Sequence, residues 1–182
     1  MTKFENFDDI EEYEGSSMAA HSDHLFDPSL TFDTIGWIKE ISGLPILVKG
    51  ILRPDDAQKA ISSGADGIII SNHGGRQLDS SPPALSALPN IRNTVGPNMP
   101  IIFDSGARNG EDVVKALALG ANFVMLGRPI MMALAASSKK GLNDYLSLLK
   151  DEIGVVMAQL GINDLEKISG DVLYDGISKN IR

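Results

Sequence analysis

Short apolar runs alternate with amphipathic stretches along most of the chain. Four runs are rich in Ile, Val and Leu and are only five to seven residues long, which is typical of strands buried on both faces; they cover residues 45–50, 66–72, 100–104 and 122–128. Between them, apolar positions recur at helical spacing, with Pro or acidic residues first and Gly last. These patterns predict helices over residues 34–42, 54–63, 83–95 and 111–119.

The alternation of strand and helix determines the class of fold. Consecutive parallel strands need crossover connections, so the units predict a parallel sheet with helices outside it, which is an α/β fold. Two connections repeat nearly the same sequence, residues 55–66 (DDAQKAISSGAD) and 111–122 (EDVVKALALGAN). The last part predicts a helical tract over 131–160, interrupted near 141–144, and then a C-terminal cap that includes 163–170.

Charge separates the amino-terminal segment from the rest of the chain. Residues 1–30 contain eight of the 24 acidic residues and a single Lys, so the remaining chain is nearly neutral. We expect residues 1–28 to form an acidic mobile arm and residues 29–182 the folded body. In the arm, His21 and His24 would bind a metal only with further ligands beside them, and two solvated histidines is the favoured interpretation.

Composition excludes several classes of protein. The 182 residues contain no Cys, so disulfides, thiolate metal sites and a cysteine nucleophile are absent. No apolar run approaches the length of a membrane span, and the acidic start resembles no targeting signal, which predicts a cytoplasmic protein. No basic stripe suits nucleic acid, although a few Arg and Lys could bind a small anion.

The segment after the second predicted strand carries the most specific candidate chemistry. Residues 71–79 read SNHGGRQLD, where two glycines allow a tight turn beside a ligand. His73 can accept a proton near neutral pH, and the planar fork of Arg76 matches a carboxylate. Together they suit an acid substrate that loses a proton, and two ordinary surface residues are the alternative.

Three further strand ends carry charge or glycine. Lys49 ends an apolar run, which favours an anion or an electron-rich ring as its partner, unless the side chain simply reaches solvent. The third and fourth strands end in turns that pair Gly with Arg, residues 104–110 and 126–129. Backbone amides and guanidinium groups of this kind bind phosphate, and phosphate sites recur after the last strands of (β/α)8 barrels.

These motifs, in this order and spacing, resemble the FMN-dependent α-hydroxy acid dehydrogenases and oxidases. That family includes glycolate oxidase, lactate oxidase, L-lactate dehydrogenase and flavocytochrome b2, and has a TIM (β/α)8 barrel. The resemblance covers about residues 25–175 and rests on five segments: 27–32 (DPSLTF), 45–50 (PILVKG), 71–79, 104–108 (DSGAR) and 126–129 (LGRP). It implies that the chain is the C-terminal half of the barrel, with four βα units.

The resemblance also implies roles for individual residues. His73 would be the active-site base and would contact the substrate, whose carboxylate Arg76 would clamp. Lys49 would lie beside the flavin ring. The remaining FMN contacts implied by the motifs are Ser71, Asp104, Ser105, Gly106, Ala107, Arg108, Gly127 and Arg128.

The chain departs from the family pattern in what it lacks. The first four strands are absent, and with them the tyrosines that touch substrate and the carboxylate that orients the base histidine. Asn109 and Phe32 stand where many members have Arg and Trp. The half-barrel should expose two strand edges and an apolar interior, and such a surface demands a partner. Three explanations are possible: a complementary half-barrel chain covers it, two copies of the chain associate, or the chain is a truncated product. We expect that interior to be formed by Ile46, Val48, Ile68, Ile70, Ile102 and Val124.

The predicted function is FMN-dependent oxidation of a small L-2-hydroxy acid, lactate-like or glycolate-like, to a 2-oxo acid, with help from the missing half. The alternative is a noncatalytic remnant or interaction module of the same family. Another phosphate-binding barrel, such as type 2 isopentenyl diphosphate isomerase or IMP dehydrogenase, shares the Gly–Arg turns but gives no reason for the pair His73 and Arg76.

Overall fold

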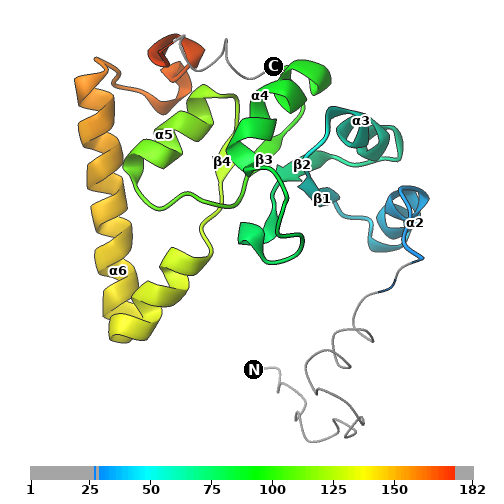
Figure 1. Cartoon of the computed structure of the whole chain (residues 1–182), viewed down its shortest axis with the longest axis horizontal. Coiled ribbons are helices and arrows are strands. Elements are labelled where there is room, and N and C mark those ends of the chain that lie inside the picture. The colour runs from blue at the N-terminus through cyan, green and yellow to red at the C-terminus, as the bar shows by residue number, and fades with distance from the viewer. Residues whose placement is uncertain (1–26, 28, 175–182) are drawn as a thin grey trace, which may run out of the picture.

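One parallel sheet forms the centre of the chain. The structure, a computed structural model, describes Asp27 and residues 29–174. Four strands pair in chain order: β1 (Leu47–Ile51), β2 (Gly67–Ile70), β3 (Ile101–Phe103) and β4 (Phe123–Val124). Figure 1 shows them side by side, with β1 and β4 at the two edges. The predicted parallel α/β sheet is confirmed, and each strand is shorter than its apolar run because the chain turns away at the strand ends.

Helices connect the strands where the sequence predicts them. Those described by the structure are α2 (Asp33–Ser42), α3 (Pro54–Ser62), α4 (Ala84–Val95), α5 (Gly110–Ala118) and α6 (Arg128–Gln159). The end signals act as expected: Pro54 is the first residue of α3, and Gly43 ends α2 with a left-handed φ of 63°. At the start of α5, the Asn109 side chain accepts a 2.9 Å hydrogen bond from the Asp112 amide.

The helix α6 is broken into two segments, earlier than predicted. The break falls at Ser137 and Ser138, whose φ values are −157° and 47°, and not near residues 141–144. The second segment then turns back so tightly that a Cβ on Gly141 would lie 2.1 Å from the carbonyl oxygen of Ala133. Gly141 therefore permits the close approach of the two segments but is not itself the break (Figure 1).

The C-terminal part of the described chain covers α5. It forms two 3₁₀ turns, η3 (Leu165–Lys167) and η4 (Gly170–Val172). Between them, Ile168 packs against Val114 and Ala118 of α5 in a separate apolar cluster. This segment is the predicted cap, built from single turns.

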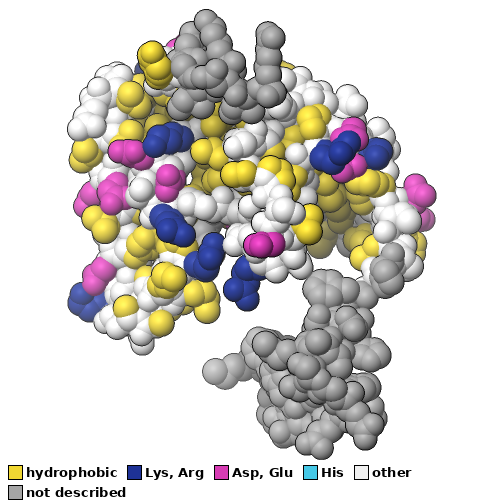
Figure 2. Space-filling view, in the orientation of Figure 1, with side chains coloured by type: hydrophobic (Ala, Val, Ile, Leu, Met, Phe, Trp, Pro, Cys, Tyr) yellow, Lys and Arg dark blue, Asp and Glu magenta, His cyan; other side chains and the backbone are white. Residues whose placement is uncertain are grey.

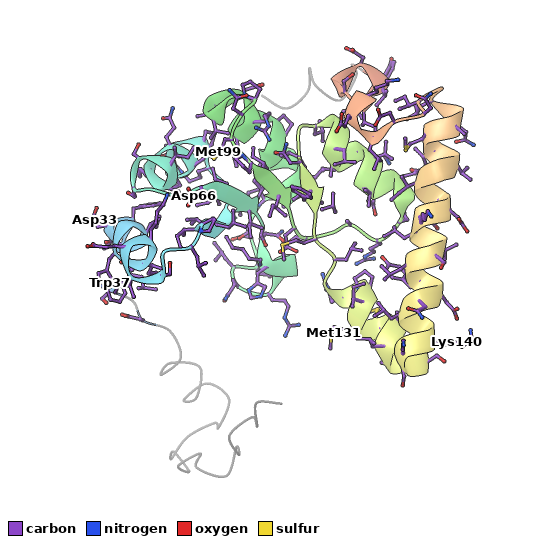
Figure 3. The ribbon with its side chains drawn as sticks, turned by 180° about the vertical axis from the view of Figure 1, so that it is seen from behind. Asp33, Trp37, Asp66, Met99, Met131 and Lys140 are labelled. Carbon is purple, nitrogen blue, oxygen red and sulfur yellow. The ribbon has the colours of Figure 1, made fainter. Side chains whose placement is uncertain are left out.

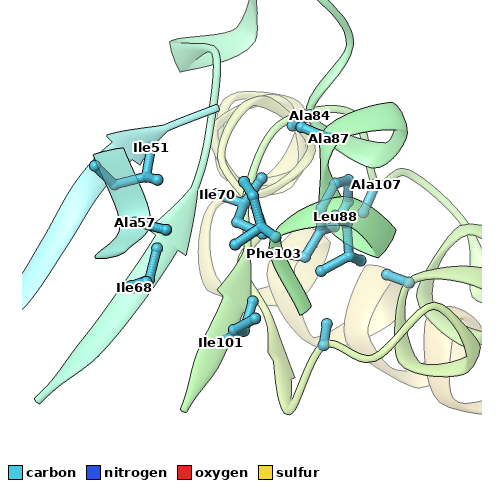
Figure 4. Close-up of a cluster of buried hydrophobic side chains, with 13 residues drawn as sticks. Ile51, Ala57, Ile68, Ile70, Ala84, Ala87, Leu88, Ile101, Phe103 and Ala107 are labelled. Carbon is cyan, nitrogen blue, oxygen red and sulfur yellow. The ribbon is translucent and has the colours of Figure 1, made fainter. Parts of the chain in front are cut away.

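The main core lies between one face of the sheet and the helices α3 and α4. Ile68 and Ile70 of β2 and Leu88 of α4 are completely buried there, and Phe103 of β3 is 2% exposed. Figure 4 shows these side chains in one layer with Ala57 of α3. The rigid packing of this layer fixes where the ends of the strands lie.

The opposite face of the sheet is open, and its composition corrects our expectation. Only Ile102 of the six predicted interior residues lies on it. The other five pack on the helix side: Ile46, Val48, Ile68, Ile70 and Val124. The open face instead carries alternate residues that are outside the core clusters, namely Leu47, Lys49, Ile69, Ile102 and Phe123. The run of three Ile in β2 is apolar at every position, so a period of two could not reveal which residues face which side.

A salt bridge attaches α2 to the start of β1. Asp66, just before β2, accepts 2.7 Å and 2.8 Å hydrogen bonds from Nζ of Lys39 in α2 and from the Ile46 amide. Figure 3 shows Asp66 between α2 and the sheet. The Lys39 hydrogen bond, followed by that of the Ile46 amide, lowers the pKa of Asp66. The pair holds α2 beside the free edge of β1.

The assignment of the two faces predicts different costs for two truncations. Ile70→Ala should reduce the free energy of unfolding by about 2–4 kcal/mol, because it leaves a cavity in the packed core. Phe123→Ala should change it by less than about 0.5 kcal/mol, because Phe123 is 67% exposed. Urea unfolding of the chain measures both, and similar losses for the two variants would contradict the assignment.

Candidate active site

The loops after β2, β3 and β4 meet at the carboxyl-terminal edge of the sheet and enclose a cavity of about 270 Å³. His73 and Arg76 both line it, as the resemblance requires. The other predicted site residues that line this cavity are Asp104, Ser105, Gly106, Ala107, Arg108, Gly127 and Arg128. Nine of the eleven predicted site residues therefore share one cavity, although they come from three separate loops.

The two remaining predicted residues lie next to this cavity. Lys49 and Ser71 line a second cavity of about 380 Å³ to which His73 also contributes. A hydrogen bond joins Ser71 directly to Asp104 of the first cavity. The structure thus brings all eleven residues to the same edge of the sheet.

Lys49, Ser71 and Asp104 join the ends of three neighbouring strands. Nζ of Lys49 lies 3.0 Å from Oδ2 of Asp104 and donates a 3.2 Å hydrogen bond to Oγ of Ser71. The Ser71 hydroxyl donates a 2.6 Å hydrogen bond to the same Oδ2. Ser71 is 2% exposed, so its polar group needs these partners. Of the two kinds of partner that the sequence favoured for Lys49, an anion or an electron-rich ring, the described residues supply an anion, Asp104.

A bulge in β1 directs Lys49 to the open face. The register between β1 and β2 shifts after Lys49, so that Ile51 pairs with Ile70. The extra residue is Gly50, whose φ of 97° is available to Gly at little cost. The shift allows Val48 and Ile51 both to pack in the core while Lys49 faces the site.

The charge of Asp104 is stabilised within this cluster. Burial raises its pKa, but the hydrogen bond from Ser71, and then the hydrogen bond and charge of Lys49, lower it more. The net effect places the pKa of Asp104 below its ordinary value of 3.8. An anionic Asp104 next to a cationic Lys49 is therefore the resting state of the cluster near neutral pH.

The turn that carries His73 has an uncommon backbone. His73, Gly74 and Gly75 have consecutive φ values of 56°, 66° and 73°. Oγ of Ser71 accepts a 3.0 Å hydrogen bond from the His73 amide, and Oγ of Ser105 accepts a 2.9 Å hydrogen bond from the Gly74 amide. Left-handed backbone is unfavourable for a residue with a Cβ, so these contacts hold His73 in place.

Three arginines and two backbone amides form the basic part of the site. Nη2 of Arg128 donates a 3.2 Å hydrogen bond to the Gly74 carbonyl, and a Cβ on Gly74 would lie 3.0 Å from the same nitrogen. Arg108 and Arg76 are exposed on the same face, where Figure 2 shows Lys and Arg side chains gathered near the start of α6. Among the described residues, no acceptor faces the amides of Gly106 or Ala107. This donor set suits a phosphate group.

Support from α6 is the feature that sequence reasoning missed. The Tyr145 hydroxyl donates a 3.1 Å hydrogen bond to the carbonyl oxygen of Arg108. Oε2 of Glu152 accepts a 2.8 Å hydrogen bond from the Gly110 amide. These side chains come from a helix about 40 positions further along the chain. The only signal in the sequence was their spacing of seven, which places them on one face of a helix.

Two sequence predictions concern residues that the structure does not describe. The arm of residues 1–28 lies outside the described residues except for Asp27, and so do His21 and His24. Within residues 29–174, no group of three His, Asp or Glu could hold a metal ion. In the same range, no helix is both long and apolar enough to cross a membrane.

The fold and the site together define a class of protein. Parallel βα units whose last strands end in Gly–Arg turns are typical of phosphate-binding barrels. The sequence model of the family described as FMN-dependent dehydrogenase matches residues 3–175. The chain belongs to this family, whose cofactor is FMN, and its four βα units are part of a TIM barrel. The match excludes the alternative of an unrelated phosphate-binding barrel.

Known proteins match at high identity over most of this chain. A 2-hydroxyacid oxidase of Dictyostelium discoideum is 48% identical over 151 residues, which are 83% of this chain and 39% of that protein. The mouse 2-hydroxyacid oxidase 1 is 45% identical over 85% of this chain and 42% of its own length. The chain therefore spans about two fifths of the length of these relatives.

Solved structures show the same partial match. A crystal structure of the monotopic membrane protein (S)-mandelate dehydrogenase superposes with a TM-score of 0.81 and 40% identity, over 87% of this chain and 42% of that one. The lactate oxidase of Pediococcus acidilactici gives a TM-score of 0.77 and 39% identity, over 85% and 44%. At about 40% sequence identity, the similarity to these structures indicates a shared family as well as a shared fold.

The cluster of Lys49, Ser71 and Asp104 predicts a pH-dependent effect of Asp104→Asn. The folded-state pKa of Asp104 is lowered, so its charge stabilises the fold above about pH 4, and this is lost as pH falls through the lowered pKa. At pH 7 the variant should lose roughly 1 kcal/mol, a modest value because Lys49 is 38% exposed and water screens it. The difference in free energy of unfolding between the wild type and Asp104→Asn should shrink towards pH 2.

Urea unfolding at several pH values checks this, and Asp171→Asn on the exposed turn η4 is the control. A loss that stays constant from pH 7 to pH 2 would show that the charge of Asp104 has no part in the cluster.

Proposed function

We propose that this chain provides the base, the substrate clamp and the phosphate site for FMN-dependent oxidation of a small L-2-hydroxy acid, lactate-like or glycolate-like, to a 2-oxo acid. The observation that supports this most is the single cavity shared by His73, Arg76 and the two Gly–Arg turns. The names of the relatives support the reaction class, because they are hydroxy acid, lactate and mandelate enzymes.

The chemistry of the donors fits FMN. Arg108, Arg128 and the amides of Gly106 and Ala107 would hold its phosphate, because guanidinium groups and unpaired amides bind a dianion strongly. Lys49 and Ser71, which line the neighbouring cavity, would contact the flavin ring. When bound, FMN supplies the acceptor of two electrons, which no side chain in the chain provides.

His73 and Arg76 have separate tasks in this proposal. The guanidinium of Arg76 pairs with the substrate carboxylate through two parallel hydrogen bonds and fixes the position of the hydroxyl-bearing carbon. The His73 imidazole accepts the proton that the substrate loses. Among the described residues, no side chain forms a hydrogen bond with this imidazole, so the group that orients it belongs to the rest of the barrel.

Four further βα units would complete the barrel around the open face. The edges of β1 and β4 have no pairing partner in the described chain, and Phe123 on the open face is 67% exposed. Trp37 and Ile41 of α2, and Leu44 just after it, are also exposed, and Trp37 lies on the side of α2 away from the sheet (Figure 3). Exposed strand edges beside apolar surface require a partner. Complementary units, on this or another polypeptide, fit better than a second copy, which would duplicate the phosphate site.

A noncatalytic role is the alternative, and the missing orienting group for His73 is the observation that favours it. The cytoplasmic location stays a prediction, drawn from the lack of a targeting signal in the sequence, and two relatives from Arabidopsis thaliana are named as peroxisomal.

Supplying the missing units should restore activity. Co-expression with the part of the Dictyostelium relative that precedes its matched region should give a yellow complex whose flavin is bleached by L-lactate or glycolate without oxygen. The closed barrel would bury the open face and provide the orienting group. A complex that forms and binds FMN but is not bleached by any 2-hydroxy acid would favour the noncatalytic role.

In that complex, His73→Ala should reduce kcat by about 10² to 10⁴, because it removes the general base, while the flavin absorbance stays unchanged. Arg76→Lys should mainly raise KM, by roughly tenfold or more, because a point charge replaces the planar fork. Stopped-flow flavin reduction over a range of substrate concentrations measures both, with Ser80→Ala as the control, because Ser80 is exposed and lines neither of the two site cavities. Unchanged turnover of the His73 variant would contradict its role.

A further inference from the structure

The turn between β3 and α5 is held by side chains that come from α6. This turn, residues 104–110, carries Arg108 and the free amides of the phosphate site. Tyr145 and Glu152 of α6 reach its second half through the 3.1 Å and 2.8 Å hydrogen bonds described above. They lie two helical turns apart on one face of α6, and Leu149, 8% exposed, stands between them in the sequence.

The two hydrogen bonds act on different peptide groups. Glu152 binds the amide of Gly110, the first residue of α5, where a Cβ would lie 2.5 Å from the backbone of α6. This contact belongs to the packing of α5 on α6. Tyr145 instead binds the carbonyl of Arg108 itself, which lies before the helix begins.

Without Tyr145, the peptide that leads out of Arg108 would have few constraints. The Arg108 amide is held, because it donates a 3.0 Å hydrogen bond to Oδ2 of Asp112. Gly106 has a φ of 108°, so the first half of the turn contains a residue with unusual freedom. The Tyr145 hydrogen bond therefore restrains the carbonyl group of Arg108, a residue whose side chain is exposed.

The environment of Tyr145 suits a donor placed beside arginines. Its half-buried ring lines a cavity of about 580 Å³ together with Arg108 and Arg128. Burial, followed by the charges of Glu152 and Asp112, raises the pKa of the Tyr145 hydroxyl, so it remains protonated and able to donate.

From this geometry we infer that Tyr145 is a positioning residue for the phosphate of FMN, which it influences by fixing the peptide of Arg108. The inference rests on the proposed function, because it takes the turn to be the phosphate site. Preorganised donors bind more tightly because the ligand does not have to order them. Loss of the hydroxyl should thus weaken binding of the phosphate and leave contacts to the flavin ring unchanged.

The test compares FMN with riboflavin, which has the same ring but no phosphate. Flavin fluorescence titration of the full 182-residue chain gives both dissociation constants. Tyr145→Phe keeps the ring and removes one neutral hydrogen bond, so FMN should bind roughly three- to tenfold more weakly, while riboflavin should bind as before. In an Arg108→Ala background, the same change should have no further effect.

Two further measurements separate positioning from folding. Tyr174→Phe, at a residue that is 84% exposed, should change neither constant. Amide exchange in the ligand-free chain should become faster at the hydrogen-bonded amide of Arg108 in Tyr145→Phe and stay unchanged in the β2 core.

The outcomes are distinguishable. Equal weakening of both flavins would overturn the inference, because it would indicate a general structural role. Wild-type affinity of Tyr145→Phe for FMN, with a clear preference of wild type for FMN over riboflavin, would overturn it and leave the proposed function standing. A wild-type chain that binds both flavins equally would refute the proposed phosphate site and the inference with it.

Discussion

The hydrogen bonds around the Ser71 hydroxyl hold the site together. The buried Ser71 oxygen accepts hydrogen bonds from the Lys49 ammonium and the His73 amide and donates one to Asp104, so it joins the ends of β1, β2 and β3. Because a buried hydroxyl without partners is costly, these strand ends cannot separate without a loss of free energy. The position of His73 relative to Lys49 therefore follows from the pairing of the strands, and not from the conformation of a flexible loop.

The same edge of the sheet has to satisfy two opposing requirements. Turns that approach a phosphate closely need glycine and left-handed backbone, which reduce local stability, while donors in the right place need rigidity. The chain meets the second requirement with contacts between loops: Ser105 holds the Gly74 amide, and Arg128 holds the Gly74 carbonyl. The β2 loop is thus supported by the two neighbouring Gly–Arg turns, so all three act as one unit.

The sequence predicted the local features well and the long-range ones poorly. Helix signals such as Pro54 and Gly43, the strand order and the convergence of His73 and Arg76 follow from rules that act over a few residues or from the geometry of parallel sheets. The faces of β2 were wrong, because a strand that is apolar throughout gives no alternation to interpret. Tyr145 was missed, because its contact with Arg108 depends on where α6 bends back, and the bend at Ser137 had no strong signal.

The division of chemistry within the barrel explains why half of it retains so much of a site. Phosphate and carboxylate are recognised by charge and geometry at strand ends, and each such end is complete once its own βα unit and its neighbours are folded. The orientation of an imidazole is different, since the ring itself needs a hydrogen-bond partner. In this chain the backbone of His73 is fixed by Ser71, while its ring has no described partner. Under the proposed function, binding of the cofactor phosphate would be a local property of these four units, whereas proton transfer by His73 would require the completed barrel.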